Sequence, residues 1–370
     1  MIGAGVAGST AALVAARGND DVVLIDCPTL RRRGGHGETL PPEAKQVLRE
    51  LGQWEAFEAL GSRPCWANRS AWGSGRLSTW EQLNNPYGSG WHIERYRVEA
   101  MLRQAALEAG ARLVPGRVRG LERRDHLVRL ICDDGAEVDA FSVVDATGRC
   151  AAVARRLGAR RVCHDRQVGL VWHHVAEQAE AEPATLVEAV PEGWWFSAPT
   201  AAGMVTVLFG DADLLDWRWA AAHLAELLER APHTRARVAL PGSLPAHELV
   251  PAHELVPASA SLLRPAAGPG WIAVGDAAAT YDPLASQGIF HGIVTGREAA
   301  AALARDSAQT YDQKERDRFD EHLRQRRAQY NVERRWPNSE FWRRRAENAE
   351  GRHAPRRVES SRVATAGTRR

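Results

Sequence analysis

The chain has 370 residues, of which 44% are hydrophobic and 25% charged, and its formal net charge is +2. This composition is ordinary for a soluble globular protein of one large domain or two closely joined ones, and so small a net charge excludes binding to nucleic acid by bulk electrostatics. No apolar run is long enough to span a bilayer and no charged-then-apolar leader opens the chain, so we expect a cytoplasmic protein without a membrane partner. The five scattered cysteines form no C-x-x-C pair, which predicts reduced thiols and no metal site.

The first 26 residues predict a turn, a helix and a strand. Gly3, Gly5 and Gly8 form a G-x-G-x-x-G turn, an alanine-rich helix is expected over 9–17, and the following strand ends at Asp26. An acidic side chain about 20 residues after such a turn binds ribose hydroxyls, while the glycines let the backbone approach a pyrophosphate. The segment therefore predicts a dinucleotide site.

One strand of this unit is almost absent. The nucleotide fold normally opens with a strand directly before the glycine-rich turn, but only Met1 and Ile2 precede Gly3. We therefore expect several more apolar residues upstream of Met1 in the stable protein.

The middle of the chain alternates between helical and strand-like patterns. Pro42 suits the first turn of a helix, and Asp133-Asp134-Gly135 suits a hairpin turn. The expected elements are a helix over 43–51, aromatic strands and loops over 66–92, a helix over 93–109, a small sheet over 111–149, and a strand-rich region over 160–260 with one helix at 219–230.

A perfect repeat joins 245–250 to 251–256, each copy reading Pro-Ala-His-Glu-Leu-Val. The two His-Glu pairs suggest a metal site, but proline at the start of each copy opposes the single helix face that H-E-x-x-H chemistry uses. We favour a short duplication in a loop. Beyond it, 312–345 is expected to be helical and the arginine-rich remainder disordered.

The segment 271–288 suits a large anionic cofactor. A strand over 271–274 leads to Gly275 and Asp276, and after a proline-containing turn a helix opens near Gly288. The carboxylate of Asp276 can accept a hydroxyl hydrogen bond, and the helix N-terminus offers free N–H groups and a positive dipole end.

Together, 3–8, 145–148 (Asp-Ala-Thr-Gly) and 275–288 occur in the order seen in FAD-dependent aromatic monooxygenases of the hydroxybenzoate-hydroxylase fold, which the chain resembles. Within this group it is most similar to the branch of the flavin-dependent tryptophan halogenases. That branch also contains non-halogenating maturases that hydroxylate a peptidyl tryptophan during quinone-cofactor formation. The segments that carry the closer likeness are 37–42, 90–95, 193–199 and, for the maturases, 333–345.

The resemblance implies an α/β fold, with a Rossmann-like FAD-binding domain, an inserted mixed-sheet substrate domain and C-terminal helices. The implied boundaries are 1–65, 93–158 and 262–310 for the FAD-binding domain, 66–92 and 159–261 for the substrate domain, 311–345 for a helical segment, and 346–370 for a disordered tail.

The resemblance also implies the residues that hold FAD. Arg95 would reach the phosphates or ribityl chain, the backbone of Val118 the adenine, and Asp276 the ribityl or pyrophosphate region. The full implied set is Gly3, Gly5, Gly8, Asp26, Arg95, Val118, Gly148, Gly275, Asp276, Ser286, Gln287 and Gly288.

Two departures from the halogenases bear on the reaction. Their lysine for hypohalous acid falls within the segment matching 66–92, which contains no lysine here, and Ala285 stands where they place a catalytic glutamate. A methyl group cannot replace a general base. We therefore expect hydroxylation of an indole- or phenol-like substrate through a C4a-hydroperoxyflavin, with O2 as oxidant and either NAD(P)H or a partner flavin reductase as reductant.

Several alternatives stay open. Glu38 and His92 are candidate catalytic residues or merely satisfied polar groups, and Trp194 and Trp195 line a substrate channel or belong to the core. The substrate is a small aromatic molecule or one tethered to a carrier or peptide. The rival functions are a halogenase with atypical catalytic residues, a maturase acting on a peptidyl tryptophan, and a non-catalytic flavin-binding protein.

Overall fold

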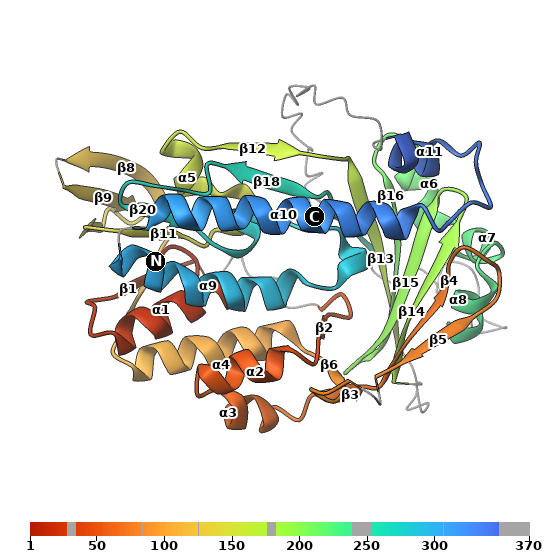
Figure 1. The fold of residues 1–370 in the computed structure, drawn as a ribbon, viewed down its shortest axis with the longest axis horizontal. Helices are drawn as coiled ribbons and strands as arrows, with labels where there is room; N and C mark the ends of the chain where they lie inside the picture. Colours follow the sequence, from red (N-terminus) through yellow and green to blue (C-terminus); the bar gives the residue numbers. More distant parts are fainter. Residues whose placement is uncertain are drawn as a thin grey trace, which may run out of the picture.

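The computed structural model describes residues 1–27, 35–82, 85–124, 126–175, 183–238, 253–305 and 307–347. It has the predicted α/β fold: a nucleotide-binding half on the left of Figure 1, a large curved sheet on the right, and one long helix crossing both. The first copy of the repeat, with His247 and Glu248, lies outside the described residues, as does the expected disordered tail from 348 onward. The domain boundaries stay a prediction.

A parallel sheet forms the centre of the nucleotide-binding half. Ile2 bridges Ile25 on one side and Asp145 on the other, so the segment before the glycine-rich turn lies between two strand pairs. The Ile2 amide donates to Val144 O at 2.9 Å and the Gly3 amide to Ile25 O at 2.7 Å. The strands are β7 (Arg112–Pro115), β1 (Val23–Asp26), β11 (Val143–Asp145), β20 (Trp271–Ala273) and the antiparallel β19 (Ala267–Gly268).

Three helices pack around this sheet: α1 (Val6–Arg17), α4 (Arg95–Glu108) and α9 (Gly288–Ala304). The small residues of α1 are almost all buried, and α9 lies against it so closely that a Cβ on Gly296 would meet Ala7 O at 2.4 Å. Only glycine permits this backbone contact. The contact holds the start of α9 beside the glycine-rich turn. Two shorter helices, α2 (Ala44–Glu50) and α3 (Trp54–Glu58), cover the same half.

Small sheets complete this half. The hairpin predicted at Asp133-Asp134-Gly135 is confirmed: it joins β9 to β10, and Gly135 has φ +86°. The small-sheet strands are β8 (Val118–Arg124), β9 (Leu127–Cys132), β10 (Glu137–Ala140), β2 (Thr39–Leu40), β6 (Gly90–His92), β3 (Arg63–Cys65), β12 (Arg160–Cys163), β18 (Ser261–Arg264) and β21 (Ala279–Thr280).

A seven-stranded mixed sheet dominates the other half, with order β17-β13-β16-β15-β14-β4-β5 and β4 parallel to β14. Both of its faces are covered, because alternate side chains of β15 enter two separate cores. Its strands are β4 (Ala67–Ala71), β5 (Ser78–Glu81), β13 (Gln167–Val175), β14 (Ala184–Val190), β15 (Gly193–Thr200), β16 (Gly203–Asp211) and β17 (His253–Pro257).

The single helix expected at 219–230 is wrong. Three short helices cover one face of the large sheet instead: α6 (Trp217–Ala222), α7 (Leu224–Leu228) and α8 (Pro232–Arg237). His223 lies outside the helical region, at φ −121° and ψ 39°, and separates the first two. Pro232 begins the third, since proline is tolerated in a first helical turn.

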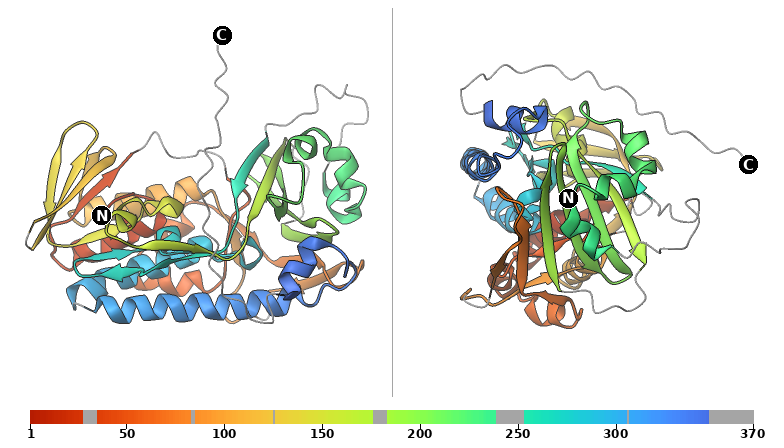
Figure 2. Two further views of the ribbon diagram at one scale, coloured as in Figure 1. Left: turned by 90° about the horizontal axis from the view of Figure 1, so that it is seen from above. Right: turned by 90° about the vertical axis from the view of Figure 1, so that its right-hand side faces the viewer.

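The helical segment expected over 312–345 is two helices, α10 (Ala308–Tyr330) and α11 (Glu340–Glu347), separated by a loop that contains Pro337. In Figure 1 and the left view of Figure 2, α10 runs along both halves, from the nucleotide-binding sheet to the edge of the seven-stranded sheet. It therefore borders any site between them. Among the described helices, none has both the length and the apolar character needed to cross a membrane.

Candidate active site

The glycine-rich turn has the tight geometry that its sequence predicts. Gly3 has φ +96°, and a Cβ there would lie 2.4 Å from Ala146 O. A Cβ on Gly8 would lie 1.9 Å from Gly3 O, so no larger residue fits. Gly5 precedes α1 in an extended conformation and supplies no side-chain cap. The first N–H groups of α1 are thus available to an anion.

Asp26 ends β1 beside this turn, where the sequence places the ribose-binding acid. Its Oδ1 accepts the Ala4 amide at 2.9 Å, and the residue is 9% exposed. The bond anchors the turn to the end of β1 and places the acid beside the turn, where a dinucleotide fingerprint puts its ribose-binding carboxylate.

Arg95 connects the turn to two other predicted residues. Its Nε donates to Glu99 Oε1 at 2.9 Å, and that oxygen lies 3.6 Å from where a Cβ on Gly5 would be. Desolvation lowers the pKa of Arg95, but the carboxylates of Glu99, Asp276 and Glu38 outweigh this and hold the pKa above its usual value. The tertiary structure therefore brings Arg95, Asp276 and Glu38 into one electrostatic cluster at the turn.

Gly275 and Asp276 lie in a short 3-10 helix against α1 and α9. The Gly275 amide donates to Thr295 Oγ1 at 2.9 Å, and Arg161 Nη2 donates to the carbonyl of Asp276 at 2.9 Å. The backbone is thus held from both sides. Asp276 is partly buried, and its carboxylate accepts no hydrogen bond from the residues that the structure describes. It is placed to accept one from a bound hydroxyl.

Asp145 of the Asp-Ala-Thr-Gly segment has a structural role. Its Oδ1 accepts the amide and hydroxyl of Thr147 at 2.9 and 2.6 Å, and its Oδ2 accepts the amides of Val153 and Ala154 at 2.9 and 2.7 Å. The four donors saturate this buried carboxylate. Gly148, at φ +68° with open space around it, is the member of the segment left for a ligand.

The segment before α9 presents another helix N-terminus. Asp282 Oδ1 caps a short 3-10 turn by accepting the Leu284 amide at 3.0 Å, and Ser286 then adopts φ +50°. Gln287 precedes α9 without a side-chain cap, and α9 starts at Gly288 in open space. The first amides of α9 are therefore free to stabilise negative charge.

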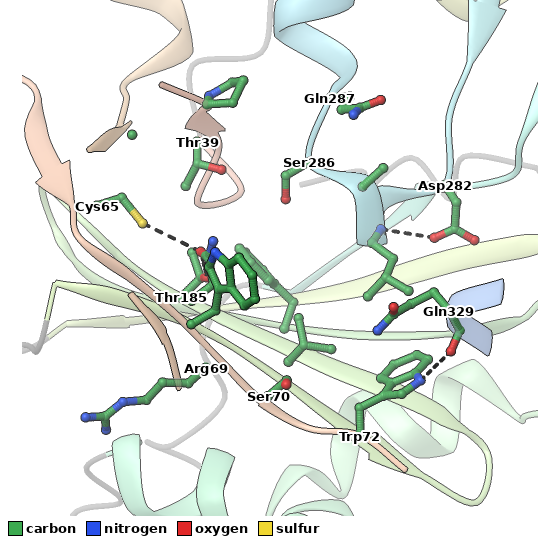
Figure 3. A pocket seen from close by; sticks show the side chains of 18 of the residues that line it. Thr39, Cys65, Arg69, Ser70, Trp72, Thr185, Asp282, Ser286, Gln287 and Gln329 are labelled. Atoms are coloured by element: carbon green, nitrogen blue, oxygen red, sulfur yellow. Dashed lines mark hydrogen bonds between the residues drawn. The ribbon is translucent and has the colours of Figure 1, made fainter. Parts of the chain in front are cut away.

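A cavity of about 450 Å³ lies between this segment, the seven-stranded sheet and α10 (Figure 3). One wall is aromatic and aliphatic, and the rest carries hydroxyl, amide and imidazole groups. The lining residues are Thr39, Leu40, Pro41, Cys65, Asn68, Arg69, Ser70, Trp72, Trp80, Gln82, Gly90, Thr185, Val187, Phe196, Asp282, Leu284, Ala285, Ser286, Gln287, His322, Gln325, Arg326 and Gln329. The predicted residues Ser286 and Gln287 thus lie at the boundary between cofactor segment and cavity.

Sequence reasoning missed the contribution of α10. His322, Gln325, Arg326 and Gln329 recur at helical spacing and share one face, which lines the cavity. The pattern was visible in the sequence, but the many charged residues of this helix predict a solvated surface equally well.

Trp194 and Trp195 do not line the cavity. Trp194 is 1% exposed, stacks on Phe209 at 4.2 Å between ring centroids and donates from Nε1 to Tyr330 Oη at 2.9 Å. Trp195 is fully buried on the opposite face of the sheet, against Trp172. Successive residues of a strand point to opposite faces, so both belong to cores, and Phe196 reaches the cavity instead.

The two catalytic candidates lie beside the cavity and not in its wall. His92 Nε2 donates to Pro183 O at 3.2 Å, and burial lowers its pKa to about 4, so it is a neutral structural group at pH 7. Glu38 accepts the His36 amide at 2.8 Å, and its carbonyl accepts the Ile93 amide. The charge of its carboxylate helps to raise the pKa of Arg95, so Glu38 belongs to the charged cluster at the glycine-rich turn.

Both lysines of the chain lie away from the cavity. Lys45, on α2, has its Nζ 4.8 Å above the ring of Trp54, and Lys314 is exposed on α10. Asp282 is the one acidic residue among those lining the cavity, and its Oδ2 is bonded to Arg326 Nε at 2.7 Å.

Comparison with known proteins places this site in context. The sequence profile of the tryptophan halogenase family matches residues 62–366. The chain is 30% identical to the menaquinone reductase of Mycobacterium tuberculosis, over 86% of this chain and 79% of that protein. It is 26% identical to the putative FAD-dependent oxidoreductase LodB of Marinomonas mediterranea, over 76% and 78%. Among solved structures, the peptidyl tryptophan dihydroxylase QhpG, essential for tryptophylquinone cofactor biogenesis, has a TM-score of 0.76 at 25% identity, covering 93% of this chain and 77% of that one.

Proposed function

This chain belongs to the tryptophan halogenase family and is an FAD-dependent oxidoreductase, and from that premise we propose that it is a monooxygenase that hydroxylates an aromatic substrate without a halide step. FAD, once bound and reduced, supplies the activation of O2. The protein's own residues bind the cofactor, position the ring to be oxygenated and exclude water.

The described residues fit FAD. The cradle formed by Gly3 and Gly8, which a Cβ would fill, supports a pyrophosphate site at the start of α1. Arg95 would contact the phosphates or ribityl chain, Asp276 the ribityl hydroxyls and Asp26 the adenosine ribose. Val118 and Gly148 would contact the nucleotide end. Ser286, Gln287 and Gly288 would face the flavin's polar end, where the free amides of α9 favour negative charge.

The observation that carries hydroxylation over halogenation is the chemistry of the cavity wall. None of its described residues is a lysine, Ala285 offers a methyl group, and Asp282 is bonded to Arg326. A halogenase needs a titratable amine to handle hypohalous acid and a general base near the ring. The described part of this wall holds no amine, its one carboxylate is paired with Arg326, and the Nε2 of its imidazole, on His322, accepts the Asp282 amide. Direct oxygenation of an electron-rich ring needs only proximity and the exclusion of water.

The apolar part of the wall supplies the proximity. Phe196 and Leu284 both line the cavity and pack against the same core, and Trp72 is held in place by donating from Nε1 to the Gln329 carbonyl at 2.8 Å. A planar ring of indole or phenol size fits between such groups, since sites for small ligands combine apolar walls with a few placed polar groups. The reducing equivalents would come from NAD(P)H or from a partner flavin reductase.

Similarity to menaquinone reductases favours a second candidate, the reduction of a menaquinone. Such a substrate needs a long apolar channel, whereas the cavity of about 450 Å³ carries five amide side chains: Asn68, Gln82, Gln287, Gln325 and Gln329. The polar lining therefore supports the hydroxylase.

A turnover assay tests both. The FAD-loaded protein is given a flavin reductase, NADH, a panel of indoles and phenols, and ¹⁸O2, with and without bromide. We expect a product heavier by one ¹⁸O atom, unchanged by bromide. A brominated product would favour the halogenase, and anaerobic reduction of a menaquinone without O2 consumption would favour the reductase.

A further inference from the structure

The cavity-facing side of α10 carries polar groups that the proposed reaction does not use. Arg326 forms ion pairs with two carboxylates, with its Nε 2.7 Å from Asp282 Oδ2 and its Nη2 2.8 Å from Asp165 Oδ2. The other cavity-lining members are His322, Gln325 and Gln329, which we term the α10 polar face. They are the part of this helix that a ligand can engage.

The protonation state of His322 follows from one hydrogen bond. Its Nε2 accepts the backbone amide of Asp282 at 3.1 Å, so that nitrogen carries no proton. A neutral imidazole then has its proton on Nδ1 and can donate only from there. Burial lowers the pKa of His322 to about 4, so the neutral form is the one present at pH 7.

The ring of His322 is fixed, yet its donor lacks a protein partner. Only 5% of the residue is exposed, and the ring packs edge-on against Tyr281, 4.8 Å between centroids. No acceptor for Nδ1–H occurs within the described part of the chain, although His322 lines the cavity. Nδ1 is not one of the fully buried polar atoms that lack a partner in the described part of the chain, so it is accessible from the cavity, and an acceptor that enters the cavity can bind it.

The opposite wall also presents donors. Asn68 Oδ1 accepts the Thr185 hydroxyl at 2.6 Å, and Gln82 Oε1 accepts the Gly90 amide at 2.8 Å. Each side-chain oxygen is thus engaged, which leaves the NH₂ groups of both amides for a ligand. The two walls together favour a substrate that is rich in hydrogen-bond acceptors.

Among the described lining residues, the cavity offers no free carboxylate to such a substrate. Asp282 is the one acidic residue of the lining and is paired with Arg326, and in Figure 3 the guanidinium of Arg69 points away from the other lining side chains. A free amino acid would have to desolvate its ammonium here without a counter-charge, which is unfavourable. An amide-linked aromatic carries acceptor oxygens and no charge.

We propose that His322 is a positioning residue whose Nδ1–H binds a carbonyl oxygen of the substrate, and that this substrate is an aromatic ring attached to neutral amide groups and not a free amino acid. The inference rests on the proposed function, because it assigns the substrate class of the same cavity. It goes beyond it by naming the residue that selects the substrate.

Two substitutions separate this role from a structural one. In His322→Asn, the side-chain Nδ2 can occupy the place of Nδ1 and keep the donor, but the acceptor for the Asp282 amide is lost. In His322→Gln, the side-chain Oε1 can occupy the place of Nε2 and keep that acceptor, but the donor is lost. If His322 binds the ligand, the His322→Asn variant should keep the higher affinity. If His322 only holds Asp282, the His322→Gln variant should keep the higher affinity.

The measurement is calorimetric titration of the FAD-loaded full chain with N-acetyl-L-tryptophanamide and with L-tryptophan. We expect the wild type to bind the amide at least about tenfold more tightly than the amino acid, His322→Asn to keep that affinity within about threefold, and His322→Gln to lose about tenfold, the effect of one hydrogen bond. The proposal would be overturned if the wild type bound L-tryptophan as tightly as the amide, or if it bound neither probe. Any other order of affinities between the two variants would also overturn it.

Turnover is measured on the same samples with a flavin reductase and ¹⁸O2. If hydroxylated product forms but the affinities do not follow the expected order, only the role of His322 is contradicted. If the affinities follow the expected order but no oxygenated product forms, only the proposed monooxygenase activity is contradicted.

Discussion

Trp194 Nε1 donates to the hydroxyl of Tyr330 at 2.9 Å, and the same hydroxyl donates to Asp282 Oδ2 at 3.1 Å. Trp194 belongs to the seven-stranded sheet, Tyr330 ends α10, and Asp282 precedes α9. One buried phenol therefore joins the substrate-side sheet, the bridging helix and the cofactor segment. Burial raises the pKa of Tyr330, so the hydroxyl keeps its proton and can serve both bonds.

Tyr330→Phe is expected to destabilise the protein by about 1–3 kcal/mol, because it leaves the buried Trp194 N–H without an acceptor and removes a donor to Asp282. Urea unfolding followed by circular dichroism measures this. Tyr87→Phe is the matched control, since Tyr87 is 41% exposed, and its stability should change by less than about 0.5 kcal/mol. Equal urea midpoints for the two variants would show that the hydrogen bonds of the Tyr330 hydroxyl do not stabilise the fold.

Gly8→Ala is expected to abolish FAD retention, because its Cβ would lie 1.9 Å from Gly3 O and push apart the turn that receives the pyrophosphate. The ratio of flavin to protein absorbance after purification gives the occupancy. Gly75→Ala is the control, since its Cβ would meet only the end of Arg335 at 3.9 Å. A Gly8→Ala protein that retains full flavin would contradict the pyrophosphate site.

Arg95→Gln is expected to weaken FAD binding about ten- to a hundredfold, since a charge-assisted bond to phosphate contributes about 1.5–3 kcal/mol. Fluorescence quenching on titration of the apoprotein with FAD measures the Kd. Arg97→Gln, on the same helix and paired with Glu94, is the control and should bind FAD as the wild type does. If both variants bind equally well, Arg95 does not contact the cofactor.

Phe196→Ala is expected to raise KM about tenfold and to increase H2O2 release per NADH oxidised, because the ring loses an apolar wall and water gains entry. Product and peroxide are quantified together, so that poor coupling is distinguished from slow reduction. Phe141→Ala, at a position 78% exposed, is the control. Unchanged coupling in Phe196→Ala would show that the reaction takes place elsewhere.

Stability is expected to fall between pH 6.5 and 4. Burial lowers the pKa of His92, His174 and His322 to about 4 from the ordinary 6.5, so in this window the unfolded chain binds more protons than the folded one. Stability is therefore complete above pH 6.5 and declines as the pH falls toward 4, by up to about 3 kcal/mol for each buried histidine.

Thermal unfolding at half-unit pH steps checks this direction. His92→Asn should flatten the decline by removing one of the three groups, and His126→Asn, at an exposed position, should leave the slope unchanged. A Tm that rises on acidification would contradict the neutral, buried state of these histidines.

The geometry of the segments that we assign to the cofactor was predictable, because it depends on backbone conformations that only certain residues allow. Gly3 and Gly8 must be glycine for the turn to close, and Asp26 must follow at the spacing of one helix and one strand. The Asp133–Gly135 hairpin was likewise encoded locally. The sequence associated the segment 145–148 with the cofactor, and only the folded chain shows that the Asp145 carboxylate is filled by four protein donors.

The cavity could not be predicted in the same way. The sequence allowed Trp194 and Trp195 to line a substrate channel or to belong to the core. Because side chains alternate along a strand, the two tryptophans lie in two different cores, and Phe196 lines the cavity. The cavity-lining face of α10 could not be distinguished from its other charged and polar faces in the sequence, because the role of a helix face depends on what packs against it.

By itself, then, the sequence determined the fold class, the glycine-rich turn and the absence of the halogenase lysine and glutamate, all of which depend on short stretches of chain. The tertiary structure alone decided which residues meet: the Trp194–Tyr330–Asp282 contact, the cluster of Arg95 with Asp276 and Glu38, and the placement of His322 in the cavity wall. The physical reason is that these contacts join residues far apart in the chain. They form only when sheet, α9 and α10 pack together, and local propensity carries no information about that packing.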